Sequence, residues 1–175
     1  MSSHQPASPT APAAERRSRL RQYQVQLLER MQAAKTGAAA VGRELGVMLA
    51  GQRCLLDLTQ VSEIVPLQPV TPVPLAHDWY QGLTNIRGHL TGVIDLARYQ
   101  GETRTAITPD CRLITFAPAL GFNCALLVER VLGLRRLDEM SDQGAGRFLD
   151  ADGQAWTRID LAALTREPRF LQLGV

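Results

Sequence analysis

Several features that usually mark an enzyme are missing from these 175 residues. Neither phosphate-binding pattern, G-x-x-x-x-G-K-[ST] or G-x-G-x-x-G, occurs, and there is no G-x-S-x-G nucleophile elbow. The one conceivable serine triad is Ser62/His77/Asp78, and its spacing does not favour it, because His77 and Asp78 are neighbours in a proline-flanked stretch. The sequence therefore predicts no catalytic residue and no cofactor.

Cysteine and histidine are scarce, with three of each. The cysteines form no C-x-x-C pair and lie in apolar runs, which predicts buried, reduced thiols for Cys54, Cys111 and Cys124. The histidines have no second ligand at metal-binding spacing. No metal site is therefore predicted.

Long apolar runs and aromatic residues are also lacking. No run approaches the roughly 20 apolar residues that cross a bilayer, and the N-terminus lacks the apolar core of a signal peptide. Residues 1–35 contain six basic and two acidic residues, whereas the remainder contains 13 basic and 15 acidic residues. Nucleic-acid surfaces are usually basic and carry stacking aromatics, which are only 5% here. We expect a cytoplasmic protein with no nucleic-acid partner and no direct membrane insertion.

The chain divides at about residue 36. Residues 1–14 are rich in Pro, Ser and Ala and are predicted to be a disordered tail. Residues 15–36 are predicted to be a helix and linker, with an apolar face formed by Leu20, Tyr23, Leu27 and Met31. This helix either packs on its own domain or contacts a partner or the inner membrane surface, and both alternatives remain open.

Residues 37–175 show short strand patterns separated by turn residues, which predicts a mainly β, barrel-like fold. One hairpin is expected to turn at residues 50–52 and another at Arg87-Gly88. The stretch "QVSEIVPLQPVTPVP" is expected to be irregular, since its prolines forbid a central strand. The stretch "DQGAGRFLDADGQ" is expected to be a polar, glycine-rich loop.

A weak internal repeat suggests two similar small barrels. "IDLA" occurs at residues 94–97 and 159–162, and "CLLDLTQVSEI" aligns with "CALLVERVLGL". Each IDLA copy follows a strand pattern and precedes a short helix-like run. Asp95 and Asp160 are therefore predicted to be structural N-caps rather than catalytic carboxylates.

Arg87 lies between Gly82 and Gly88 and carries a rigid, permanently charged fork. Gly88 is expected to supply a positive φ for the turn, and Gly82 to allow a close backbone approach. Such an arginine suits bidentate contact with a carboxylate or with helix-terminal carbonyls of a partner. An internal salt bridge, for example to Glu63, is equally compatible with the chemistry.

The stretch "VSEIVPLQPVTPVPLAHDWYQGLTNIRGHLTGVIDL", Val61–Leu96, resembles the hallmark of CheW-type chemotaxis coupling proteins. The family pattern runs V-x-E-I, a proline-rich link, G-x-x-N-[LVI]-R-G and a final [VI]-[VIL]-D-L. Two later stretches, "ALLVERVLGLRRL" and "AWTRIDLAAL", are similar to the family's later strands, so the resemblance covers about residues 46–164. The chain departs from the pattern at Glu129, where aspartate is usual, and at Gly92, which replaces a common proline.

The resemblance implies two five-stranded SH3-like barrels that share a core, with short helices after the barrels. It implies a non-catalytic adaptor between the cytoplasmic tip of a methyl-accepting chemoreceptor and the regulatory domain of a CheA-type histidine kinase, recruited to membrane-associated receptor arrays. In the family the receptor docks in a groove between the barrels. Carried over by motif, the residues that line or shape that groove are Val61, Glu63, Gly82, Asn85, Arg87 and Gly88.

The N-terminal extension and the tail "RFLQLGV" are similar to PilI-type coupling proteins of the type IV pilus, or twitching-motility, pathway. This similarity predicts a pilus-associated adaptor, with a flagellar chemotaxis coupling protein as the alternative. Two readings from other classes are a small hydrolase that uses His77 or a cysteine, and a nucleic-acid-binding barrel that uses the basic N-terminus.

Overall fold

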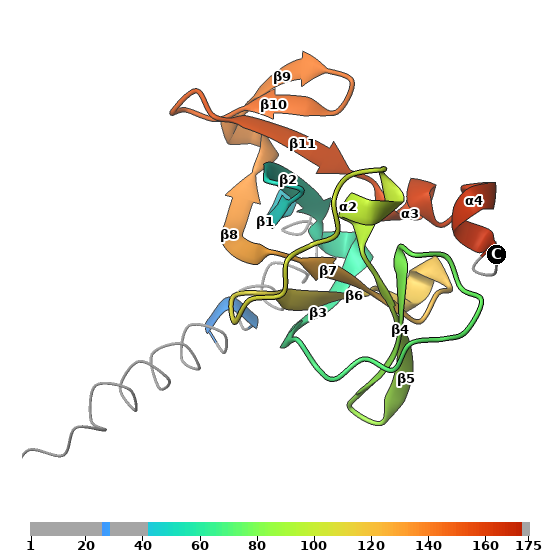
Figure 1. Ribbon diagram of the computed structural model, residues 1–175. Coiled ribbons are helices and arrows are strands. Elements are labelled where there is room, and N and C mark those ends of the chain that lie inside the picture. Colours follow the sequence, from blue (N-terminus) through green and yellow to red (C-terminus); the bar gives the residue numbers. More distant parts are fainter. Residues whose placement is uncertain (1–25, 29–41, 173–175) are drawn as a thin grey trace, which may run out of the picture.

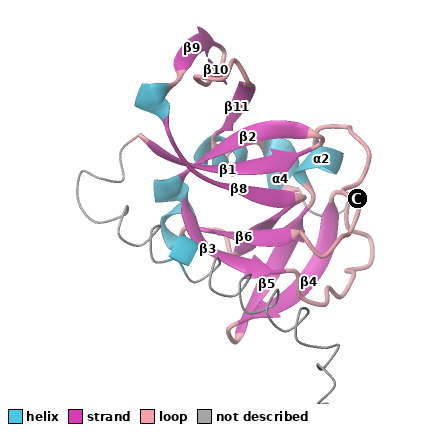
Figure 2. Cartoon of the chain, turned by 90° about the vertical axis from the view of Figure 1, so that its left-hand side faces the viewer, coloured by secondary structure: helices cyan, strands magenta, loops and turns pink. Residues whose placement is uncertain are grey.

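A computed structural model describes residues 26–28 and 42–172, and its body is two stacked β-sheets (Figures 1 and 2). One sheet has six strands in the order β8-β1-β2-β11-β10-β9, and the other has five in the order β3-β6-β7-β5-β4. The strands of the six-stranded sheet are β1 (Arg43–Leu49), β2 (Gln52–Asp57), β8 (Arg130–Arg136), β9 (Ser141–Gly144), β10 (Arg147–Leu149) and β11 (Ala155–Ile159). Those of the five-stranded sheet are β3 (Val61–Pro66), β4 (Tyr80–Ile86), β5 (His89–Ile94), β6 (Arg112–Phe116) and β7 (Cys124–Val128).

The helices are short and lie between or after strands. They are α2 (Leu96–Tyr99), α3 (Leu161–Leu164), α4 (Pro168–Leu171) and single 3-10 turns at Leu58–Gln60, Pro118–Leu120 and Leu137–Glu139. The predicted tail 1–14 and most of the predicted helix 15–36 lie outside the described residues. Of that helix, residues 26–28 are described and helical, and Leu27 is buried in the main core. At this point the segment packs on its own domain.

The main hydrophobic core lies between the sheets and takes side chains from both. It includes Leu45 and Val47 of β1 together with Ile94 of β5 and Leu126 of β7, all essentially inaccessible to solvent. A second, smaller cluster consists of side chains from the five-stranded sheet together with Cys111. The predicted fold class, mainly β with two barrel-type sheets around a shared core and short helices, is confirmed.

The internal repeat has a structural counterpart. In the six-stranded sheet β2 pairs in parallel with β11, so that Leu56 lies opposite Ile159 of the second IDLA motif. In the five-stranded sheet β7 pairs in parallel with β5, and Leu126 lies opposite Ile94 of the first IDLA motif. The two aligned cysteine-containing strands therefore pair with the two IDLA strands in the same register.

Two segments that the sequence predicted to be irregular form strands. Val61–Pro66 is strand β3, and it tolerates Pro66 because β3 is an edge strand and the proline is its last residue. Ser141–Gly144 and Arg147–Leu149 form the β9–β10 hairpin, which projects from the top of the molecule in Figure 1. Its turn residues Ala145 and Gly146 have positive φ values. Polar composition concealed this hairpin because every residue of β9 is exposed and shows no apolar alternation.

A partly buried ion network joins the first, second and last strands of the six-stranded sheet. Arg158 of β11 donates to Glu44 of β1 at 2.6 Å and to Asp57 of β2 at 3.0 Å. Glu44 is 1% exposed, and its second carboxylate oxygen has no hydrogen-bond partner. Burial raises the pKa of Glu44 above its usual value, although the hydrogen bond and charge of Arg158 act in the opposite direction.

Replacing Arg158 with methionine should destabilise the protein by about 3 kcal/mol near pH 7.5, because it leaves the Glu44 carboxylate buried without its cation. The raised pKa of Glu44 sets the sign of the pH dependence. As the pH falls toward that pKa the carboxyl takes up a proton, so the loss should be smaller near pH 4.5. Urea unfolding of wild type and variant at both pH values measures the two losses.

Arg136→Met is the matched control, because Arg136 pairs with Asp138 on the surface. It should cost less than about 1 kcal/mol at either pH. A loss for Arg158→Met that does not diminish at low pH would show that Glu44 is not the group left unpaired.

Candidate functional site

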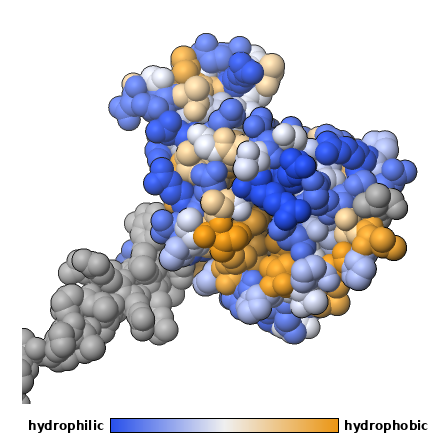
Figure 3. Space-filling view, in the orientation of Figure 1, coloured by the Kyte–Doolittle hydropathy of each residue, from blue (hydrophilic) through white to orange (hydrophobic). Residues whose placement is uncertain are grey.

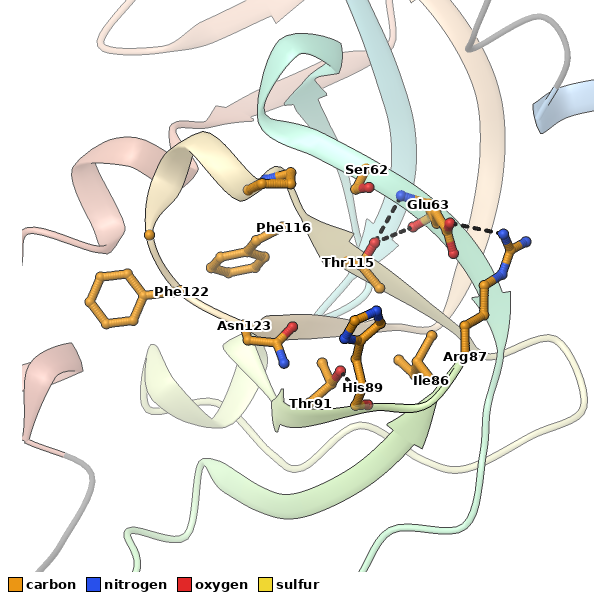
Figure 4. Close-up of a pocket in the computed structure, with 12 residues that line it drawn as sticks. Ser62, Glu63, Ile86, Arg87, His89, Thr91, Thr115, Phe116, Phe122 and Asn123 are labelled. Atoms are coloured by element: carbon orange, nitrogen blue, oxygen red, sulfur yellow. Dashed lines mark hydrogen bonds and ion pairs between the residues drawn. The ribbon is translucent and has the colours of Figure 1, made fainter.

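A groove of about 520 Å³ opens on the five-stranded half of the molecule (Figure 4). Its lining comes from the start of β3, the tip of the β4–β5 hairpin, the end of β6 and the loop that leads into β7. The lining residues are Ser62, Glu63, Ile86, Arg87, His89, Thr91, Thr115, Phe116, Pro118, Gly121, Phe122 and Asn123. Charged and polar side chains make up most of this lining, and Phe116 and Phe122 form an aromatic wall at one side of it (Figure 4).

Glu63 is directed into the groove by an irregularity in strand β3. The register between β3 and β6 shifts between Val61 and Ile64, so Glu63 lies at a bulge. The hydroxyl of Thr115 replaces the missing ladder contact, accepting from the Glu63 N–H at 2.8 Å. A bulge re-aims side chains, and here it places the Glu63 carboxylate on the rim of the groove.

Arg87 occupies the first position of a two-residue hairpin turn. Ile86 pairs with His89 across the turn, and Arg87 and Gly88 have φ values of 52° and 80°. Positive φ at both positions defines the type I′ turn that matches strand twist. Gly88 adopts this conformation freely, whereas a left-handed conformation costs a residue such as Arg87 about 1–2 kcal/mol.

Glu63 and Arg87 form an ion pair at the rim. Nη1 of Arg87 lies 3.1 Å from Oε1 of Glu63, as the dashed line in Figure 4 marks. The pair connects β3 and the β4–β5 hairpin, which lie at opposite ends of the strand order. The Arg87 side chain is nevertheless 68% exposed and that of Glu63 is 28% exposed. The internal salt bridge is therefore present, and it leaves most of the arginine accessible.

The resemblance placed six residues at a groove between the barrels; Glu63 and Arg87 line the present groove, which belongs to the five-stranded sheet, and the other four do not line it. Asn85 accepts a hydrogen bond from the Gly88 N–H at 2.8 Å, so these two residues stabilise the turn that carries Arg87. Val61 is buried in the main core. Gly82 does not line the groove either, and it packs against the backbone of Thr71 and Pro72.

Gly82 is covered by residues 67–79, which we call the proline strap. Thr71 exchanges two backbone hydrogen bonds with Leu83, at 2.8 and 2.9 Å, so the strap covers the edge of β4. A Cβ on Gly82 would lie 2.1 Å from the carbonyl oxygen of Thr71, and the φ of Gly82 is +132°. The predicted close backbone approach therefore exists, and its partner is the strap.

Sequence reasoning missed the aromatic side of the groove. Phe116, Phe122 and Asn123 lie outside the hallmark stretch, and only folding brings β6 and its following loop against the β4–β5 hairpin. Asn123 is held there because its side chain donates to the Leu90 carbonyl and its own carbonyl accepts from Gly92. His89 lies within the hallmark and points into the groove in Figure 4. The sequence feature that could have identified His89 was its position next to the predicted hairpin turn.

Asp95 and Asp160 are the N-cap residues of α2 and α3. Asp95 accepts from the Arg98 N–H and from both the backbone and hydroxyl of Thr105, and it is 1% exposed. Asp160 accepts from the Ala163 N–H and from the Gln60 side chain, and the Gln60 hydrogen bond is the main cause of a lowered Asp160 pKa. Both carboxylates are engaged in local structure, away from the groove.

The side chains that the hydrolase hypothesis would use make contacts of a different kind. Burial raises the pKa of both Cys54 and Cys124 to about 11, so these thiols are protonated at neutral pH. His77 stacks on Trp79, and Asp78 pairs with Arg98 at 2.6 Å, whereas Ser62 lines the groove. Within the described part of the chain, no three His, Cys, Asp or Glu residues gather as a possible metal site.

Among residues 26–28 and 42–172, no helix is long and apolar enough to span a membrane.

The two-sheet architecture matches a known fold. The crystal structure of the scaffolding protein TtCheW from Thermoanaerobacter tengcongensis superimposes with a TM-score of 0.57 at 20% sequence identity. The match covers 69% of this chain and 91% of that protein. At this identity the similarity establishes the fold.

The family follows from the sequence match. The model of the CheW-like domain matches residues 44–168, and the chain belongs to this family. The chemotaxis protein CheW of Thermotoga maritima is 27% identical over 88 residues, which are 50% of this chain. The aligned part spans 57% of that relative's length.

Gly82→Ala should destabilise the protein by about 2 kcal/mol or more, because the added Cβ collides with the strap backbone as well as straining φ. Gly153→Ala is the matched control, since Gly153 also has a positive φ but has open space around its Cβ position. It should cost only about 1 kcal/mol. Chemical denaturation measures both losses, and equal values would mean that the strap moves aside without cost.

Proposed function

We propose that this protein is a non-catalytic adaptor that couples the cytoplasmic tip of a methyl-accepting chemoreceptor to the regulatory domain of a CheA-type histidine kinase. The observation that carries the proposal is the groove, because the hallmark stretch of the family builds its charged rim at Glu63 and Arg87. Membership of the CheW-like family supports it, and the T. tengcongensis structural neighbour is a scaffolding protein. The receptor's helical hairpin is the proposed occupant of the groove.

The energetics of Arg87 favour a role in binding over a role in stability. A left-handed backbone costs this residue about 1–2 kcal/mol. An ion pair as exposed as Arg87–Glu63 contributes at most about 1 kcal/mol. The pair therefore does not offset the strain by itself. Strained residues concentrate at ligand-binding sites, and a pre-placed guanidinium on a groove rim suits carboxylates or helix-terminal carbonyls.

Exposed apolar surface lies on the same half of the molecule. Four of the large apolar side chains that are exposed in the described residues belong to segments around the five-stranded sheet, namely Val73, Leu75, Leu90 and Ile107. In Figure 3 apolar surface gathers over the lower part of the molecule, and the upper and middle parts are mainly hydrophilic. An adaptor needs surface for more than one partner, and this half offers apolar surface beyond the groove.

We assign the adaptor to type IV pilus, or twitching-motility, signalling. The support is the resemblance of the N-terminal extension and of the tail "RFLQLGV" to PilI-type coupling proteins. In this proposal the protein is cytoplasmic and is recruited to membrane-associated receptor arrays through its partners. In this proposal residues 37–175 are the CheW-like domain.

Arg87→Glu should weaken binding to the receptor's cytoplasmic hairpin at least about tenfold, which is roughly 1.4 kcal/mol, because it replaces an attractive contact with repulsion. The double variant Glu63→Arg/Arg87→Glu restores an internal ion pair with reversed orientation. If Arg87 contacts the receptor, the double variant stays weak. If the internal pair is all that matters, binding recovers. Isothermal titration at low and high salt measures the affinities.

Arg136→Glu is the control for this series, because Arg136 is an exposed, ion-paired arginine far along the chain on β8. It should leave receptor affinity within about twofold. Thermal unfolding of every variant shows whether the fold is intact. Unchanged affinity in folded Arg87→Glu would remove the groove assignment.

An in-frame deletion of the gene in its native host should abolish twitching and leave chemotactic spreading in soft agar intact, because the proposed kinase and receptor belong to the pilus pathway. Expression of the wild-type chain should restore twitching, and the Arg87→Glu variant should not. Lost chemotactic spreading in soft agar with normal twitching would instead place the adaptor in flagellar chemotaxis. Normal behaviour in both assays would contradict the adaptor proposal.

A further inference from the structure

The aromatic wall of the groove rests on a ring that comes from the C-terminal segment. Phe116 and Phe122 line the groove, and both rings contact Phe170 of α4. Phe170 stacks with Phe116 at a centroid distance of 6.4 Å and meets Phe122 edge-on at 5.8 Å. Phe170 itself is 1% exposed and does not line the groove.

The Phe170 ring is also held by side chains from two other segments. Trp79, at the end of the proline strap, stacks with Phe170 at 5.8 Å, and Tyr99 of α2 meets it edge-on at 6.1 Å. Aromatic pairs of this geometry stabilise a structure beyond the effect of their buried area. Phe170 therefore connects the strap and α2 to the wall of the groove.

Tyr99 also attaches the short helix that carries Phe170. The Tyr99 hydroxyl donates to the carboxylate of Glu167, and the guanidinium of Arg169 lies 4.3 Å from the centre of the Tyr99 ring. A helix of four residues has no stability of its own, so these contacts determine where α4 lies. Burial, with the Glu167 contact, raises the pKa of Tyr99 to about 12, so the hydroxyl remains a donor throughout the neutral range.

The wall is also anchored at its start, because Phe116 belongs to β6, which pairs with β3, and the Ala117 N–H donates to the Gln60 carbonyl at 2.9 Å. The loop before β7 contains a 3-10 turn, Pro118–Leu120, in which Leu120 and Gly121 donate to the carbonyls of Ala117 and Pro118. Asn123 is tied to β5, but among the described aromatic pairs Phe122 contacts Phe170 alone. Phe122 also packs against the main core as a partly buried side chain, and Phe170 supplies its ring contact.

We infer that Phe170 is a positioning residue of the groove, so that the C-terminal segment controls the shape of the docking site without touching the occupant. The inference rests on the proposed function for its binding readout, and it has a second readout that needs no partner. Removing the ring should release Phe122 and the loop at residues 117–123 while the two sheets remain folded. Docking of a receptor hairpin then weakens because the wall must be ordered on binding.

The test compares Phe170→Ala and Phe170→Leu with Leu161→Ala in the full-length protein. Leu161 is fully buried in the same core but does not line the groove, so its variant reproduces a core loss without the aromatic contacts. Phe170→Leu keeps much of the apolar volume and stays folded if the alanine variant does not. The first measurement is hydrogen exchange at the amides of Leu120 and Gly121, without any partner.

Both Phe170 variants should exchange faster than wild type at these two amides, and Leu161→Ala should not. The second measurement is affinity for the cytoplasmic hairpin of a methyl-accepting chemoreceptor, which should fall about tenfold in Phe170→Ala and about threefold in Phe170→Leu. Leu161→Ala should stay within about twofold of wild type. Equal exchange in the Phe170 and Leu161 variants, or equal losses of affinity at matched thermal stability, would overturn the inference. A wild-type protein that does not bind the receptor contradicts the proposed function, and the exchange data still decide the role of Phe170.

Discussion

The packing of two sheets against one shared core is the constraint on which the other features depend. The chain must pass from one sheet to the other, and it does so where β2 leads through Leu58–Gln60 into β3 and where β7 leads into β8. Because β2 and β7 each pair in parallel with an IDLA strand, the same strands determine where α2 and α3 begin. Breaking this core would therefore separate the sheets and disperse the elements that border the groove.

The groove illustrates how local irregularity places function on a regular scaffold. A bulge in β3 directs Glu63 toward the rim, and a strained type I′ turn holds Arg87 opposite it. Neither device gains stability, since the exposed ion pair is weaker than the strain that it accompanies. The adjoining strands β4 and β5 offset this strain, because their backbone hydrogen bonds and buried side chains hold the turn in place.

The C-terminal segment adds an aromatic layer that connects distant parts of the chain. Phe170 brings together the end of the proline strap, helix α2 and the wall of the groove through ring contacts alone. In this arrangement the strap has two functions. It covers the exposed edge of β4, which would otherwise present unpaired backbone groups, and it delivers Trp79 to the aromatic layer.

The amino-acid sequence by itself determined the local features: the hairpin turn at Arg87-Gly88, the N-caps at Asp95 and Asp160, the family hallmark and the mainly β class. Each of these depends on neighbouring residues, whose spacing is visible in one dimension. It did not reveal strand β3 or the β9–β10 hairpin, because an edge strand ending in proline and a fully exposed strand lack the apolar alternation that marks a strand. Only the tertiary structure decided that Val61 is core, that Gly82 lies under the strap, and that Phe116, Phe122 and Phe170 support the groove. Those placements arise from contacts between segments far apart in the chain, which side-chain packing selects and local pattern does not encode.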